Sequence, residues 1–249
     1  YIVHRYVLIK FLDKGLGQQR DGKFNLEEYI HKLVFPMGVT SDEQVNGIDH
    51  NLWIIDERLS YHSYLASDKQ LRKHDVLESQ TLDEPDIAVY KNFFKNASAY
   101  AEGTQPFRTI VVVEFKRPGR TDYYKKRKTK DGQAIEIEDD PIQQVIDYVD
   151  AIRKGTIYNE SKQRPIYKGQ DKIPAFAYII CDISDKIRDI VDNFGHLKPM
   201  VEGSNQGYFG NHPTKDIYFE IVSYDLLLQR AKERNNILFE KLDLPKLDN

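Results

Sequence analysis

The chain has 249 residues, of which 40% are hydrophobic and 30% are charged, and its formal net charge is −3. This composition excludes a disordered chain and predicts either one large globular domain or a core with an appendage. The slightly negative charge also excludes a chain that binds nucleic acid over its whole surface, so such a partner has to be met by a local basic patch.

The cysteine content and the hydropathy pattern bear on the compartment. Cys181 is the single cysteine, so the chain forms no intramolecular disulfide. No apolar stretch is long enough to cross a membrane, and no signal-peptide pattern is present. We therefore expect a cytoplasmic protein with no membrane partner. Because the chain begins with Tyr1 rather than Met, we interpret it as a domain of a longer polypeptide.

Residues 1–48 predict a helical hairpin, either an appendage or a linker to a preceding region. Apolar residues follow a helical period from Ile2 to Leu16, and a second helix is predicted from about Asn25 to Phe35. We see no catalytic arrangement in this segment. Residues 49–249 are then expected to form the main domain with a strand-helix extension at its C-terminal end.

The segment after the hairpin predicts one helix over residues 51–65, with Glu57 beside its apolar stripe. A longer connection, residues 92–107, separates two predicted strands. Its aromatic residues fit a flap near a site or an extension of the sheet, and the sequence does not decide between them.

Two strands carry the strongest chemical signal. Asp86 ends an acidic turn that enters a β-branched and aromatic strand, and residues 109–115 form an aliphatic run typical of a strand buried on both faces. Within that second strand Glu114 and Lys116 point to one face, because side chains two residues apart do so. If the strands pair, Asp86 and Glu114 meet. Two carboxylates and a strand carbonyl are the oxygen ligands that Mg²⁺ prefers, and Lys116 could orient an attacking water.

A basic stretch follows Lys116 directly. It predicts a hairpin or loop that follows a phosphate backbone, although an acidic stretch over residues 136–140 also permits a simple acidic-basic hairpin. The candidate nucleic-acid contacts are Arg117, Arg120, Lys125, Lys126, Arg127, Lys128 and Lys130.

The later segments predict alternating helices and strands. A helix over residues 141–154 opens with Pro141 after a capping aspartate and presents Gln144 and Tyr148 one turn apart, with Gln143 as an alternative to Gln144. The remaining predictions are a strand over 175–181, a helix over 185–194, a turn over 203–213, a strand over 217–222 and a helix over 224–242.

The order Pro85-Asp86, Glu114-x-Lys116 and Gln144-x-x-x-Tyr148 resembles the signature of the PD-(D/E)xK phosphodiesterase superfamily. The resemblance implies an α/β fold with a mixed central sheet flanked by helices, the restriction-endonuclease-like core. It also implies that Gln144 and Tyr148 orient the lysine, a water or the substrate backbone. In that superfamily the helix before the first core strand often carries an acidic residue near the metal. Glu57 is the candidate here, and the alternative is a solvated glutamate that pairs with a nearby base.

Residues 50–195 resemble the nuclease domains of Shedu-like bacterial defence proteins, and the flanking segments resemble the region that follows a GHKL-type ATPase domain. These resemblances imply a DNA endonuclease that uses Mg²⁺ or Mn²⁺ in anti-phage defence, with Asp86 and Glu114 as metal ligands. An ATPase domain of the same polypeptide and a second copy of the chain are the implied protein partners.

Other chemistries lack their motifs. The histidines do not have zinc-site spacing, and the sequence contains no G-x-S-x-G elbow, no phosphate-binding G-x-x-x-x-G-K loop and no dinucleotide fingerprint. Two alternatives stay open: a non-catalytic nucleic-acid-binding or oligomerisation module on the same fold, and an RNA substrate.

Overall fold

A computed structural model describes residues 1–17, 27–43, 50–60, 62, 64–91, 109–128, 133–158, 165–169, 172–245 and 247. Within these ranges the chain forms an α/β fold around a mixed sheet of seven strands, as the sequence predicts. The strands lie in the order β1 (Tyr64–Ser67), β3 (Ile87–Lys91), β4 (Thr109–Phe115), β9 (Ala175–Ile180), β12 (Ile217–Val222), β11 (Gly207–Asn211) and β10 (Leu197–Pro199). The strands β4, β9 and β12 run parallel, and the outer pairs are antiparallel.

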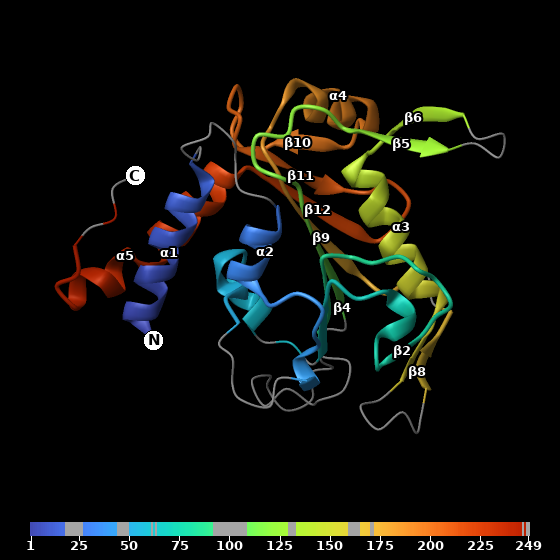
Figure 1. Cartoon of the computed structure of the whole chain (residues 1–249), viewed down its shortest axis with the longest axis horizontal. Coiled ribbons are helices and arrows are strands. Elements are labelled where there is room, and N and C mark those ends of the chain that lie inside the picture. Colours follow the sequence, from blue (N-terminus) through green and yellow to red (C-terminus); the bar gives the residue numbers. More distant parts are fainter. Residues whose placement is uncertain are drawn as a thin grey trace.

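Two smaller sheets extend from this body. The first contains β2 (Leu77–Glu78), β7 (Thr156–Tyr158) and β8 (Pro165–Lys168). The second is a hairpin of β5 (Tyr124–Lys128) and β6 (Ala134–Glu138), which projects away from the central sheet in Figure 1.

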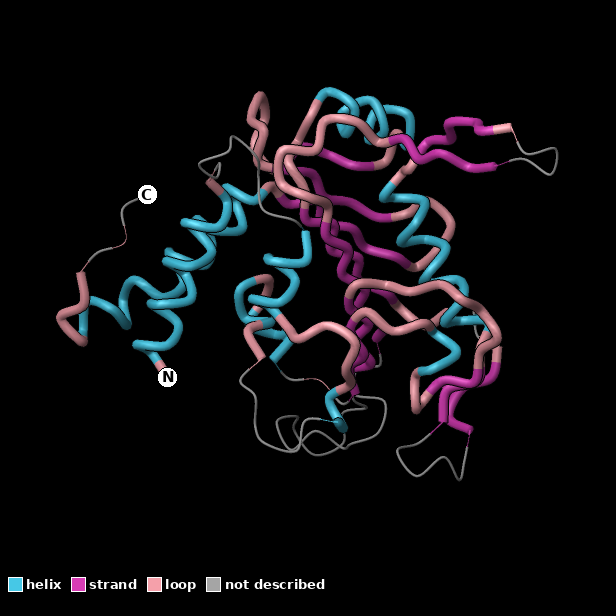
Figure 2. The backbone as a smooth tube through the Cα atoms, viewed as in Figure 1, coloured by secondary structure: helices cyan, strands magenta, loops and turns pink. Residues whose placement is uncertain are grey.

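Helices cover both faces of the central sheet (Figure 2). One face carries α3 (Pro141–Lys154) and α4 (Asp185–Phe194), and the other carries α1 (Ile2–Leu16), α2 (Glu27–Val34) and α5 (Tyr224–Lys241). The structure accordingly has two apolar cores, one on each side of the sheet. Among the described residues, none of the helices combines the length and apolar character that a membrane-spanning helix requires.

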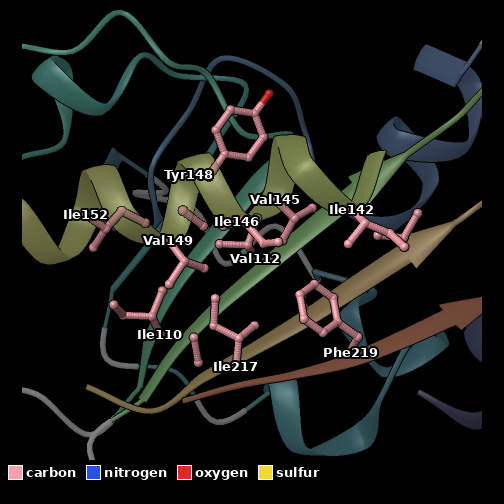
Figure 3. Packing of buried hydrophobic residues seen from close by; sticks show 14 of the residues in the cluster. Ile110, Val112, Ile142, Val145, Ile146, Tyr148, Val149, Ile152, Ile217 and Phe219 are labelled. Carbon is pink, nitrogen blue, oxygen red and sulfur yellow. The ribbon is translucent and has the colours of Figure 1, made fainter. Parts of the chain in front are cut away.

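The strand β4 divides its side chains between these two cores. Ile110 and Val112 belong to the core under α3, whereas Val111, Val113 and Phe115 belong to the core on the opposite side. Figure 3 shows the apolar side chains of α3 directed onto the first of these surfaces. This alternation follows from the two-residue period of a strand, so Glu114 lies on the α3 side of the sheet.

Residues that are typical of helix caps lie at the ends of α3, α4 and α5. The Asp140 carboxylate accepts hydrogen bonds from the first-turn amides of α3, and Ser184 and Ser223 do the same for α4 and α5. Gly195 closes α4 in the left-handed conformation. These caps account for the accuracy of the predicted helix boundaries.

The described part of residues 1–48 is integrated into the main core. Tyr6 of α1 packs edge-on against Phe239 of α5 at 5.2 Å between ring centroids, and Ile30 of α2 belongs to the same core as Val111. Both predicted helices form, and they cover one face of the sheet instead of standing apart from it.

The prediction of one helix over residues 51–65 is wrong. This segment forms the short 3₁₀ helices η2 (Leu52–Ile54) and η3 (Glu57–Ser60) and then enters β1. The Arg234 guanidinium donates to the carbonyl oxygens of Trp53 and Ile54 at 2.9 and 2.7 Å, so these carbonyls are satisfied without a continued α-helix. Two further 3₁₀ helices are η1 (Ser41–Glu43) and η4 (Leu71–Lys73).

The predicted turn over residues 203–213 contains the strand β11. Gly207 permits this pairing: a Cβ atom there would lie 2.0 Å from the carbonyl oxygen of Ile221 on β12. The glycine therefore marks a close approach between two strands, which sequence alone did not distinguish from a turn.

Candidate active site

The predicted site residues meet where β4 ends. In the antiparallel β3–β4 pair Ile87 lies opposite Val113, so continuing the register by one residue brings Asp86 opposite Glu114. The backbone N–H of Phe115 donates to Asp86 Oδ2 at 2.6 Å. This bond fixes the Asp86 carboxylate at the end of the buried strand, next to the Glu114 position.

Lys116 connects the strand to α3. Its Nζ atom donates to Glu114 Oε1 at 2.7 Å and to Gln144 Oε1 at 2.8 Å, and Gln144 Nε2 donates to the Tyr148 hydroxyl at 2.6 Å. Gln143 instead donates to Asp147 on the exposed side of the helix. The structure thus selects Gln144 from the two candidate glutamines.

The backbone of Lys116 is held from two further elements. Its N–H donates to the carbonyl oxygen of Ile180 in β9 at 2.8 Å, and its carbonyl oxygen accepts from the Tyr224 hydroxyl of α5 at 2.5 Å. Lys116 therefore has a defined position even though it lies just beyond the strand.

The two carboxylates are buried, and their environment opposes ionisation. Glu114 is 4% exposed, and burial raises its pKa to about 7 against the opposing effect of Lys116. Burial, then repulsion from Glu114 and Glu27, raises the pKa of Asp86 well above its ordinary value. Burial lowers the pKa of Lys116, but attraction to Glu114 and Glu27 outweighs it, and the net pKa is raised. The site concentrates negative charge around one cation.

One acceptor in this cluster has no partner. Glu114 Oε2 is buried and makes no hydrogen bond to any described residue. A buried carboxylate oxygen without a partner is costly, and such atoms commonly mark a position that an ion or another ligand completes.

The sequence analysis missed two residues of α2. Burial raises the pKa of the Glu27 carboxyl, which acts electrostatically on Asp86 and Glu114. One turn later, His31 Nδ1 lies 3.9 Å from Asp86 Oδ1. The available signal was their i, i+4 spacing on a short apolar helix.

His31 is a neutral neighbour of the site. Burial lowers its pKa to about 4, so its ring is uncharged at neutral pH. Its Nε2 atom lies 2.8 Å from Ser67 Oγ, and the ring stacks on Phe115 with centroids 5.4 Å apart. The ring therefore fills the space between α2 and the end of β4 beside Asp86.

Glu57, predicted to approach the metal, lies in a different cluster. Its carboxylate accepts from Arg5 Nη2 at 2.5 Å and Nη1 at 3.0 Å, and the Arg5 guanidinium lies 4.5 Å from the ring centroids of Tyr1 and Trp53. Within the described ranges it has no hydrogen bond or ion pair with the site residues. The structure therefore agrees with the alternative, a partly exposed glutamate paired with a nearby base, because the helix that was expected to carry Glu57 to the site does not form.

The basic stretch lies in the loop after Lys116 and in β5, the strand that leads away from the site. Arg117 is exposed, Arg120 pairs with Asp139 at 2.9 Å, and Lys125 pairs with Asp139 at 3.1 Å. Lys126 lies opposite Glu136 in the hairpin register. Arg127 and Lys128 complete β5, whereas Lys130 lies outside the described residues. Acidic residues thus balance part of the predicted phosphate-binding charge.

An open pocket of about 840 Å³ lies beside α3, away from Glu114 and Lys116. Its lining is acidic, with Glu78, Asp83, Asp147 and Asp150 against the single lysine Lys154. We do not assign the chemistry to this pocket, because none of the residues that contact Lys116 lines it.

The donor set can be tested against a divalent metal. Over the described ranges there is no group of three or more His, Cys, Asp and Glu side chains that could hold a metal ion. Mg²⁺ commonly uses only one or two carboxylates and takes its other ligands from water and phosphate. Asp86 and Glu114, whose Oε2 atom has no partner, therefore fit such an ion.

Comparison of the chain with protein-family models, curated proteins and solved structures finds no match.

Proposed function

We propose that this protein is a metal-dependent nuclease that cleaves phosphodiester bonds in DNA, built on a restriction-endonuclease-like core of the PD-(D/E)xK type. The support is the convergence of Asp86, Glu114 and Lys116 at the end of one buried strand, with Gln144 in contact with the lysine. The residues that carry the resemblance in the sequence thus lie together in the structure.

The observation that carries the proposal is the state of Glu114. Its Oε2 atom is buried without a partner, and burial, together with repulsion from Glu114, raises the pKa of Asp86 next to it. A purely structural ion pair does not need a second buried carboxylate, because Lys116 already neutralises the first. A dication would neutralise both acids and occupy the free acceptor.

Each residue then has a role. Asp86 and Glu114 would hold Mg²⁺ or Mn²⁺, which when bound supplies Lewis-acid polarisation of a phosphate oxygen. The Lys116 ammonium stabilises negative charge that develops on the phosphoryl group and orients the attacking water. Gln144 fixes Lys116 through its amide oxygen, and Tyr148 fixes Gln144 in turn.

The test combines metal binding with cleavage. We expect calorimetric titration of Mn²⁺ to show binding to the wild-type chain and none to Glu114→Ala, and plasmid cleavage to follow the same order. Glu57→Ala is the matched control, because it removes a carboxylate of the Arg5 cluster and should leave metal binding intact. Absence of Mn²⁺ binding to the wild type in both the presence and the absence of DNA would refute the proposal.

A further inference from the structure

The β5–β6 hairpin is exposed on both of its faces. Figures 1 and 2 show it extending away from the central sheet and the helices. Side chains of both strands are exposed, among them Lys125, Lys126, Ile135 and Glu136. A lone two-stranded ribbon is at best marginally stable in water, so an arm of this kind is suited to gain contacts from a partner.

The base of the hairpin is fixed to the body. Arg120 pairs with Asp139 at 2.9 Å, Lys186 of α4 pairs with Glu138 at 2.5 Å, and the Lys186 ammonium lies 5.0 Å from the Tyr124 ring centroid. Because these contacts hold the base, the arm has a fixed direction relative to the end of β4. It starts only eight positions after Lys116, and Asp139 at its base acts electrostatically on both Glu114 and Lys116. The base of the arm therefore lies near the candidate site.

The hairpin register gives its two faces different chemistry. On one face Lys126 lies opposite Glu136 and Tyr124 lies opposite Glu138, so the charges alternate in sign. On the other face Lys125 lies opposite Ile137, and the next position pairs a basic residue with Ile135. The second face therefore combines basic and aliphatic residues.

We infer that this arm enters the major groove of B-form DNA, so that the substrate of the proposed site is double-stranded DNA. The inference rests on the proposed nuclease function and names its substrate class. Basic side chains bind phosphates at the groove edges, and aliphatic side chains contact thymine methyl groups on its floor. Lys125, Ile135 and Ile137 supply both kinds of contact from one face.

Dimensions separate duplex DNA from RNA. Five residues in a strand span about 16 Å, and a B-form major groove about 12 Å wide admits a two-stranded ribbon. The major groove of A-form RNA is too deep and narrow for one. Single strands are bound by aromatic platforms in a basic groove, and the face with Lys125 and Ile137 has aliphatic residues instead.

The acidic pocket on α3 restricts the path of the DNA. Glu78, Asp83 and Asp147 repel a phosphate backbone from that side, whereas Arg117 and Lys125 attract it. The duplex is therefore expected to lie along the hairpin side of the site.

The test measures binding without cleavage. Fluorescence anisotropy measures the affinity of the wild-type chain, in excess chelator, for three labelled nucleic acids of one sequence. These are a DNA duplex, an RNA duplex and a DNA single strand. We expect the DNA duplex to bind at least about tenfold more tightly than the other two. Lys125→Gln, on the face that enters the groove, should weaken it about threefold to tenfold and lower the salt dependence by about one ion. Lys14→Gln, an equal charge change on an exposed position of α1, should leave binding unchanged.

A groove-specific competitor completes the test. Methyl green, which occupies the major groove, should displace the protein, and netropsin, which occupies the minor groove, should not. Equal affinity for RNA, displacement by netropsin alone, or full binding by the hairpin variant would overturn the inference. Duplex binding in the expected order without any cleavage in Mg²⁺ or Mn²⁺ would support groove binding by the hairpin and refute the proposed nuclease activity. The failure of one hypothesis can therefore be distinguished from the failure of the other.

Discussion

Two charged clusters, each with a buried base, differ in their balance of charge. In the first, Arg5 meets one acid, Glu57, through two hydrogen bonds. In the second, Asp86, Glu114 and Glu27 lie around one buried cation, Lys116, with Arg120 acting on Glu27 alone, and one carboxylate oxygen has no partner. Opposite charges in equal number compensate one another, whereas excess like charge raises the pKa of the acids and destabilises the ionised state.

The comparison separates a structural cluster from a candidate functional one. Both contain a buried base and a glutamate, and composition alone would not distinguish them. Uncompensated charge at the end of β4 has a physical use only if a cation or a charged substrate compensates it. This imbalance makes the two clusters respond differently to substitution.

The largest expected difference is in activity. Asp86→Asn and Glu114→Gln should each lower DNA cleavage by about 10³-fold or more, because each removes a ligand charge from the site. Glu57→Gln should change the rate less than about twofold, because its partner is Arg5. Rates are measured on supercoiled plasmid in Mg²⁺ and in Mn²⁺. Equal losses for Glu57→Gln and Glu114→Gln would remove the distinction between the clusters.

Stability should depend on pH through Glu114. Its pKa in the folded chain is about 7, above the ordinary value of 4.5, so the folded state binds this proton more tightly than the unfolded state. That contribution is complete below pH 4.5 and is lost as the pH rises to about 7, up to about 3 kcal/mol.

Glu114→Gln lacks this proton, so the free energy of unfolding of the variant relative to that of the wild type should decrease as the pH falls from 8 towards 4.5. Urea unfolding at several pH values measures the free energy of unfolding of both chains. A variant less stable than the wild type at pH 8 would show that the ionised Glu114–Lys116 pair stabilises the fold.

Substitutions in the Arg5–Glu57 cluster should change the free energy of unfolding. Arg5→Ala is expected to lower the free energy of unfolding by about 2 kcal/mol, because it removes the guanidinium between Tyr1 and Trp53 and half of an ion pair whose Glu57 side chain is 46% exposed. Arg188→Ala breaks the exposed pair with Asp185 and should cost less than about 0.5 kcal/mol. Urea denaturation measures both effects. Equal effects would contradict the conclusion that the Arg5–Glu57 cluster stabilises the fold.

The smallest effect is expected at Tyr148. Tyr148→Phe removes the hydroxyl that accepts from Gln144, and should lower kcat about threefold to tenfold with KM unchanged, because Lys116 keeps its bond to Gln144. Tyr158→Phe removes a comparable hydroxyl bonded to Glu78 and should leave kcat unchanged. A rise in KM alone would assign Tyr148 to substrate binding.

The sequence predicted the parts of this structure that local chemistry determines. The strand with Glu114 follows from its aliphatic run, and α3 follows from Asp140, Pro141 and its apolar period. The meeting of Asp86 and Glu114 was expected only if two strands paired, and the register fulfils that condition.

Contacts between distant segments could not be predicted. Arg234 occupies the carbonyls of Trp53 and Ile54, a contact across 180 residues, and the helix expected there does not form. In the same way Glu27 reaches the site because α2 packs on β4, and no local pattern encodes that packing. At such positions tertiary contacts override the local secondary-structure propensity.

The bond from Tyr224 to the backbone of Lys116 has a consequence for biosynthesis. Tyr224 follows Lys116 by 108 residues, and it is translated after every other segment that contacts the lysine. At about 5–20 residues per second, a ribosome needs roughly 5–20 seconds to add that length. A nascent chain therefore carries its carboxylates and lysine for that interval before the final anchor is available. The completed arrangement belongs only to chains whose synthesis has passed the start of α5.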